Sequence, residues 1–206
     1  MIELHRDDAL WTVTLNRPDK ANSLTRAMLD RLEQIAAEAA GAGICALVLT
    51  GRGKVFSAGA DLDEARAGLA TDPVWERVSA RIAALPCLTV AALNGTLAGG
   101  AHGMALACDL RLAVPGASFF YPVMRLGFLP QPSDVTRLAA LVGPARARMI
   151  LLAGARIGAE EALAWGLIDR IAAPEALLPD ALALVAEARA AHPAHVAAIK
   201  AMLGRP

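Results

Sequence analysis

Two apolar runs, each leading into a segment of small residues, constrain the fold of this chain most strongly. Residues Ile44–Thr50 and Leu88–Leu93 contain no charged side chain, which is typical of strands buried on both faces of a parallel sheet. Ser57–Asp61 lies just beyond the first run, and Gly95–Gly103 follows the second. Helical patterns separate these runs, and this alternation predicts an α/β protein with connected parallel strands.

The overall charge argues against a nucleic-acid or membrane protein. The 206 residues carry 20 Lys+Arg and 20 Asp+Glu, so the formal net charge is zero. A nucleic-acid surface would show a basic excess, and we expect none here. No apolar run reaches the length of about 18 residues that a membrane span needs.

The cysteines and the N-terminus indicate a cytoplasmic protein without a metal centre. Cys45, Cys87 and Cys108 show neither a CxxC motif nor the spacing of metal ligands, so we expect reduced thiols and no bound metal. Met1–Asp8 is too charged for a secretory leader.

The small-residue turns could provide backbone N–H groups to a ligand. Small residues allow the backbone to approach a ligand closely, and the first turn of a helix has unpaired N–H groups. Two such amides that converge on one carbonyl oxygen would stabilise an oxyanion or an enolate. Either turn alone would more often be a packing turn, but both follow consecutive buried strands, at the sheet edge where ligands bind in α/β proteins.

In order and spacing, a series of motifs along nearly the whole chain resembles the crotonase family, the enoyl-CoA hydratases and isomerases. The segments that carry the resemblance are Asn16–Leu24, Ala46–Gly51, Phe56–Leu62, Val90–Gly95, Ala98–Gly100, Leu106–Arg111, Leu126–Pro130, Leu141–Gly143 and Ala159–Ile168. The resemblance implies a spiral of ββα repeats over residues 1–172. It also implies that the C-terminal helical segment, 173–206, is shorter than in the family.

The same resemblance implies an acyl-CoA substrate and indicates which residues contact it. The backbone N–H groups of Ala58 and Gly100 would form the oxyanion hole. Residues in the positions that contact coenzyme A or substrate are Lys20, Ala21, Ala58, Gly59, Ala60, Asp61, Leu62 and Gly100. Coenzyme A would enter as part of the substrate, no cofactor would be permanently bound, and the assembly would be a homotrimer or hexamer.

The chain departs from the family at the carboxylates that move protons. Gly103 and Val123 stand where hydratases carry glutamates, and Gln131 stands where other branches carry an aspartate. Hydration needs one group to deprotonate water and another to protonate the α-carbon. Glycine and valine can do neither, which disfavours ordinary hydratase chemistry.

Four other polar residues are candidates for acid, base or orienting roles. His102 has a suitable intrinsic pKa but is more commonly structural. Tyr121 could donate a hydrogen bond, although a buried tyrosine usually has its hydroxyl paired. Gln131 can orient a water but cannot act as a base. Asp134 follows Ser133, the expected helix N-cap, where acidic residues are common for dipole reasons alone.

Two functions from different classes remain open. The first is an acyl-CoA enzyme of isomerase, hydrolase or lyase type that uses the Ala58 and Gly100 amides. The second is a catalytically weak or inactive CoA-binding or assembly paralogue. A dinucleotide-binding domain and a serine hydrolase are disfavoured, because the chain lacks both G-x-G-x-x-G and G-x-S-x-G.

Overall fold

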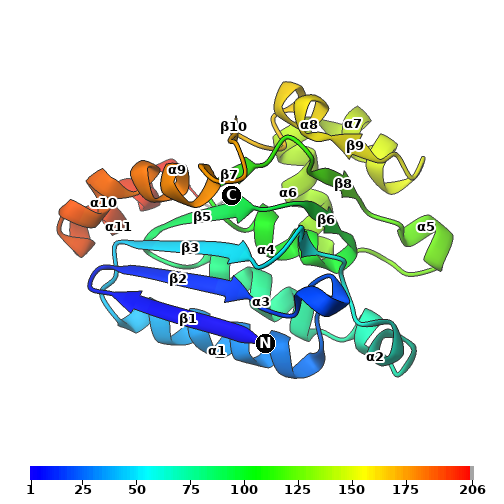
Figure 1. The fold of residues 1–206 in the computed structure, drawn as a ribbon, viewed down its shortest axis with the longest axis horizontal. Helices are drawn as coiled ribbons and strands as arrows, with labels where there is room; N and C mark the ends of the chain where they lie inside the picture. The colour runs from blue at the N-terminus through cyan, green and yellow to red at the C-terminus, as the bar shows by residue number, and fades with distance from the viewer. Residues whose placement is uncertain (205–206) are drawn as a thin grey trace.

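The strands form two sheets, between which the chain alternates from β3 to β8 (Figure 1). The structure, a computed structural model, describes residues 1–204. The larger sheet has the order β1-β2-β3-β5-β7-β10, with β1 at Ile2–Asp7, β2 at Leu10–Leu15, β3 at Ala46–Gly51, β5 at Leu88–Leu93, β7 at Leu110–Ala113 and β10 at Arg170–Ile171. The smaller sheet has the order β4-β6-β8-β9, with β4 at Val55–Ser57, β6 at Thr96–Ala98, β8 at Ser118–Phe120 and β9 at Ile157–Gly158.

Apart from the first, whose strands β1 and β2 both lie in the larger sheet, the repeats give one strand to each sheet, which produces the predicted ββα spiral. Strands β3, β5 and β7 of the larger sheet are parallel, and each continues into β4, β6 or β8 of the smaller one. β4, β6 and β8 are parallel in turn, while β1 pairs with β2 and β9 with β8 in antiparallel fashion. The carboxyl ends of the buried strands therefore meet at one edge, beside the smaller sheet.

The two apolar runs form central strands, as predicted. In β3 the residues Ala46–Thr50 are buried, and in β5 Thr89–Leu93 are buried. They pair in register, with Val48 opposite Val90. Both faces of these strands are covered, which explains why the runs contain no charged side chain.

Helices cover both faces of the larger sheet. The α-helices are α1 (Arg26–Gly41), α2 (Leu62–Arg66), α3 (Val74–Ala83), α4 (His102–Leu106), α5 (Val123–Leu126), α6 (Pro132–Val142), α7 (Pro144–Leu151), α8 (Ala159–Trp165), α9 (Leu177–Leu184), α10 (Ala186–Ala190) and α11 (Pro193–Leu203). Short 3₁₀ turns are η1 (Pro18–Lys20), η2 (Leu69–Thr71) and η3 (Gly99–Ala101). α3 packs between α1 and α4, α4 packs on α6, and α9 packs on β3, β5 and β7. No helix within residues 1–204 is long and apolar enough to cross a membrane.

Helix α6 begins two residues earlier than an N-cap at Ser133 would place it. Its N-cap is Gln131, and Pro132 is the first helical residue. The prediction that Ser133 is the N-cap is therefore wrong. Proline suits the first helical position because its missing N–H needs no acceptor there. Ser133 and Asp134 consequently lie within the first turn.

Candidate functional site

One cavity brings together the two small-residue turns. It has a volume of about 340 Å³ and lies where strands β4, β6 and β8 of the smaller sheet end. Its lining includes Ala58, Gly59, Ala60, Leu62, Ala65, Arg66, Ala70, Trp75, Gly99, Gly100, Tyr121, Pro122, Val123, Leu126, Phe128, Leu129 and Gln131. A volume in this range is typical of small-molecule sites.

The two turns are in direct backbone contact. Gly59 and Gly99 both adopt left-handed conformations, with φ of +92° and +56°. A Cβ atom built on Gly59 would lie 3.0 Å from the carbonyl oxygen of Ala98 and 3.5 Å from Cα of Gly99. Glycine at 59 therefore serves both the left-handed conformation and the close approach of the second turn.

In the first turn, the free amide belongs to Ala60 and not to Ala58. The Ala58 N–H donates to the carbonyl oxygen of Ala21, at 3.0 Å between nitrogen and oxygen. Ala60 forms a parallel bridge with Leu24. The hydrogen bonds of that bridge run from Leu24 N–H to Gly59 and from Asp61 N–H to Leu24. Among residues 1–204, no acceptor pairs with the Ala60 N–H, so this amide replaces Ala58 as the candidate donor.

In the second turn, Gly100 lies at the start of a helical segment. η3 begins at Gly99 and leads directly into α4, and the N–H groups of a first turn have no acceptor inside the helix. A Cβ atom at Gly100 would lie 3.2 Å from the ring of Trp75. The Trp75 ring therefore packs against the Gly100 backbone, and both residues line the cavity.

His102 is buried behind this turn. Its Nδ1 lies 3.0 Å from the carbonyl oxygen of Gly99, and a carbonyl can only accept, so Nδ1 carries the proton. Its Nε2 has no partner among the described residues. Burial lowers the pKa of His102 to about 4, so the ring is neutral at pH 7. His102 stacks on Tyr121, with ring centroids 5.2 Å apart, and does not line the cavity.

Tyr121 and Asp134 form a buried hydrogen-bonded pair. The Tyr121 hydroxyl donates to Oδ2 of Asp134 at 2.9 Å. Burial, assisted by the carboxylate of Glu76, raises the pKa of Asp134 to about 7, against the opposing effects of Tyr121 and Arg137. Burial and the neighbouring Asp134 raise the pKa of Tyr121. Tyr121 and Gln131 line the cavity, whereas Asp134 lies behind them.

The remaining predicted contact residues, Asp61, Ala21 and Lys20, lie outside the cavity lining, and the first two hold the first turn in place. Asp61 accepts a hydrogen bond from Arg17 at 2.7 Å and caps α2 by accepting from the N–H groups of Asp63 and Glu64. The Arg17 guanidinium lowers the pKa of Asp61. Ala21 supplies the carbonyl that binds Ala58 N–H, and Lys20 is exposed at the end of η1.

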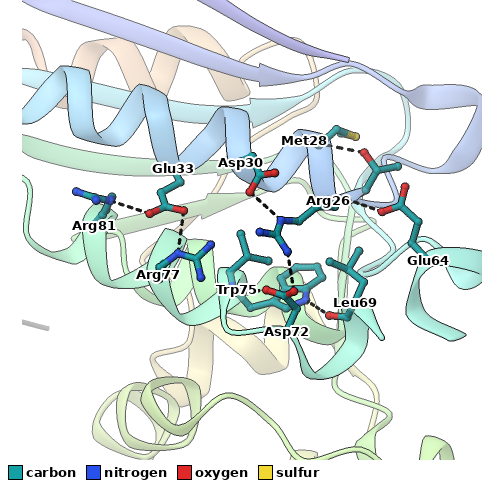
Figure 2. A network of polar contacts seen from close by, with 12 residues as sticks. Arg26, Met28, Asp30, Glu33, Glu64, Leu69, Asp72, Trp75, Arg77 and Arg81 are labelled. Atoms are coloured by element: carbon teal, nitrogen blue, oxygen red, sulfur yellow. Dashed lines mark hydrogen bonds and ion pairs between the residues drawn. The ribbon is translucent and has the colours of Figure 1, made fainter. Parts of the chain in front are cut away.

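Polar contacts anchor the wall of the cavity that α2 and η2 provide (Figure 2). The carboxylate of Glu64, on α2, accepts from the backbone N–H of Arg26 at 2.6 Å. The Arg26 guanidinium pairs with Asp72 at 2.6 Å. The indole N–H of Trp75 donates to the carbonyl of Leu69 at 2.7 Å. The segment between the first turn and α3 is thus tied to α1 at both Glu64 and Asp72, and to Trp75 at Leu69.

Sequence reasoning missed the individual roles of Asn22 and Trp75. The buried Asn22 side chain donates to the carbonyls of Arg52 and Val55 at 2.9 and 2.7 Å, and accepts from Arg17 N–H at 2.8 Å. Asn22 lies in a motif segment, but only its φ of +51° and its distant partners distinguish it. Trp75 carries no local signal that would place its ring on Gly100.

A larger cavity, of about 770 Å³, lies elsewhere and contains none of the candidate residues. Leu88, Leu110, Leu184 and residues of α11 line it. Lys200 on its wall binds Asp109 at 2.7 Å and the Cys87 carbonyl at 2.8 Å. These bonds attach α11 to the larger sheet, and we assign the chemistry to the smaller cavity because both turns meet there.

Comparisons with known proteins agree with this architecture. The sequence profile described as enoyl-CoA hydratase/isomerase matches residues 5–206. YngF of Bacillus subtilis is 39% identical over 189 residues, covering 88% of this chain and 72% of YngF. The 4-chlorobenzoyl coenzyme A dehalogenase-1 of an Arthrobacter species is 33% identical over 205 residues, covering 95% of this chain and 74% of its own.

Solved structures match over almost the whole chain. The crystal structure of an enoyl-CoA hydratase from Bacillus anthracis superimposes with a TM-score of 0.91 at 30% identity, covering 98% of this chain and 81% of that one. The enoyl-CoA hydratase EchA8_6 of Mycobacterium marinum gives a TM-score of 0.89 at 31% identity, with 98% of both chains covered. By sequence and by fold, this chain belongs to the enoyl-CoA hydratase/isomerase family, the crotonases.

Proposed function

We propose that this protein is an acyl-CoA enzyme that holds the thioester oxygen with the backbone N–H groups of Ala60 and Gly100. The observation that carries the proposal is the meeting of the two turns in one cavity, with Ala60 N–H unpaired among residues 1–204 and Gly100 in the first turn of a helical segment. Amides fixed in this way favour the negative charge that develops on a thioester oxygen, and each is worth about 3 kcal/mol of transition-state stabilisation.

The reaction that fits this site best is an isomerisation, hydrolysis or lyase-type cleavage through an enolate or oxyanion. Gly103 and Val123 offer no carboxylates at the hydratase positions. Of the four candidate acid, base or orienting residues, Tyr121 and Gln131 line the cavity. The relatives include a dehalogenase as well as hydratases, which supports a family site that accommodates different acid and base groups.

The cavity walls favour an apolar acyl group. Leu62, Val123, Leu126 and Leu129 line it, and Leu129 is 85% exposed at its rim. Exposed apolar surface of this kind commonly serves a ligand or a second subunit. We therefore propose a homotrimer or hexamer whose contacts cover part of this rim, and light scattering of the purified protein tests that assembly.

Calorimetry with CoA and acetyl-CoA tests the binding function. We expect binding below millimolar concentration, and an absence of heat from both ligands at that concentration would overturn the proposal. A panel of enoyl-, β-hydroxy- and β-keto-acyl-CoAs then identifies the reaction. Binding without any turnover would identify a CoA-binding paralogue instead of an enzyme.

Two substitutions at Gly100 test the oxyanion hole directly. Gly100→Pro removes the proposed N–H donor, whereas Gly100→Ala keeps it. Both bring new atoms toward the ring of Trp75, which would lie 3.2 Å from an added Cβ. We expect at least a 100-fold larger loss of turnover for proline than for alanine. Equal losses would show that the Gly100 amide does not bind the reacting oxygen.

A further inference from the structure

The carboxyl group of Asp134 is buried beside the cavity without a full set of hydrogen bonds. The residue is 1% exposed, and its Oδ1 has no partner among the described residues. An unpaired buried acceptor destabilises a protein, because its lost hydration is not replaced by a hydrogen bond. An aspartate favoured only by the dipole of α6 would keep its carboxylate in water. A helix-start preference therefore does not account for the position of Asp134.

The carboxyl of Asp134 lies directly over Gly103. A Cβ atom built on Gly103 would lie 2.8 Å from Oδ1 of Asp134 and 3.4 Å from Cβ of Ser79. Asp134 comes from α6 and Gly103 from α4, and these two helices are packed together. The space into which a residue-103 side chain would extend is therefore taken by a carboxyl group from a neighbouring helix.

We propose that Asp134 supplies this site with the carboxyl group that residue 103 lacks, and that it exchanges protons with the substrate through the hydroxyl of Tyr121. This inference rests on the proposed acyl-CoA function. Tyr121 lines the cavity and donates its hydroxyl proton to Asp134 at 2.9 Å. Tyr121 is thus the catalytic residue that touches the substrate. Asp134 acts through it and is a positioning residue that also receives the proton.

The proton step balances within the pair and the substrate. The C–H bond at the α-carbon breaks, and its electron pair enters the enolate whose oxygen the Ala60 and Gly100 amides hold. The proton bonds to the Tyr121 oxygen while the Tyr121 hydroxyl proton passes to Oδ2 of Asp134. Tyr121 therefore carries no net charge after the step. The reverse transfer returns a proton to carbon and leaves Asp134 ionised.

The charges around the pair keep Asp134 available as acid and as base near neutral pH. Glu76 on α3 disfavours its ionisation, whereas Arg137 on α6 and the Tyr121 hydroxyl favour it. His102 on α4 stacks on Tyr121 and is neutral, because burial lowers its pKa to about 4. With burial as the largest effect, the pKa of Asp134 lies at about 7, where a general base works most efficiently.

Exchange of the α-protons of butyryl-CoA in D₂O, followed by NMR, tests the inference without knowledge of the complete reaction. For the native protein we expect an exchange rate that rises with an apparent pKa near 7. Asp134→Asn keeps an acceptor for Tyr121 but cannot take up a proton, so we expect exchange about 100-fold slower and no inflection near 7. Tyr121→Phe should show the same loss.

The control is Glu160→Gln, which removes an exposed acidic residue from the first turn of α8 and should leave the exchange rate unchanged. Calorimetry must show that Asp134→Asn binds butyryl-CoA within about twofold of the native affinity. Exchange at the native rate in Asp134→Asn would overturn the inference. So would a native protein that binds butyryl-CoA but does not exchange its α-protons. If butyryl-CoA does not bind to the native protein, the proposed function itself fails.

Discussion

The Nδ1–H of His102 donates to the carbonyl oxygen of Gly99, with 3.0 Å between the two atoms. That carbonyl belongs to the same peptide unit as the Gly100 N–H. In a trans peptide the two groups point in opposite directions, so a donor on the carbonyl fixes the direction of the N–H and polarises it. His102 therefore orients a proposed oxyanion donor from behind the cavity.

Replacement of His102 should weaken the polarisation of the bound thioester. His102→Phe keeps an aromatic ring on Tyr121 but removes the Nδ1 donor. We expect about tenfold slower turnover, less than the loss of an oxyanion donor itself, and a smaller infrared shift of the thioester carbonyl on binding. His102→Asn, whose amide can donate near the former Nδ1, should restore part of that shift. An unchanged carbonyl frequency in His102→Phe would contradict this role.

Gly103 and Asp134 should be energetically coupled. Gly103→Ala places a methyl group 2.8 Å from Oδ1 of Asp134, and overpacking of this kind typically costs about 1–3 kcal/mol. In an Asp134→Ala background the same change should stabilise by up to about 1 kcal/mol, because alanine favours a helix. Urea denaturation of the four proteins measures the coupling. An equal cost of Gly103→Ala in both backgrounds would show that the carboxyl does not occupy this space.

The buried carboxyl should make stability fall as the pH rises. Folding raises the pKa of Asp134 from 3.8 to about 7, so between these values the folded state holds the proton and the unfolded state does not. The stability that the protonated Asp134 contributes is present at pH 4 and is lost by pH 8. For that difference in pKa, the free energy of unfolding falls by roughly 4 kcal/mol. Asp134→Asn should lack this loss.

His102 has the opposite effect, so the comparison must be made between variants. Burial lowers the pKa of His102 from 6.5 to about 4. The stability that the neutral His102 ring contributes is therefore present above pH 6.5 and lost toward pH 4. Urea denaturation of native and Asp134→Asn protein from pH 5 to pH 8 cancels this effect. The difference in unfolding free energy between the two proteins should grow with pH in favour of the variant. A constant difference would refute the raised pKa.

Gly95 should tolerate no side chain. A Cβ atom there would lie 2.0 Å from the carbonyl oxygen of Lys54 and 2.7 Å from its carbonyl carbon, and backbone cannot move aside as a side chain can. We expect Gly95→Ala to destabilise the protein by about 3 kcal/mol or more. Gly116→Ala is the matched control, because an added Cβ atom meets nothing within 4 Å. Similar thermal midpoints for the two variants would argue against the close approach of Gly95 to the Lys54–Val55 backbone.

The residues of β3 and β5 by themselves determined the centre of the larger sheet. A strand covered on both faces must be apolar throughout, so Ile44–Thr50 and Leu88–Leu93 indicate buried parallel strands. The small residues beyond them predict two turns at one edge of the sheet, and both line one cavity. These features depend on neighbours in the chain, and for that reason they can be read from the sequence.

Only the tertiary structure decided which groups in those turns are available for chemistry. The motif at Ala58 predicts a donor, but its N–H is taken by Ala21, which lies 37 residues earlier in the chain. Asp134 has the sequence context of an ordinary helix-start residue, yet the packing of α6 on α4 places it over Gly103. Hydrogen-bond partners and burial are set by segments distant in sequence, so a local pattern can locate a turn but cannot show which of its groups remain unpaired.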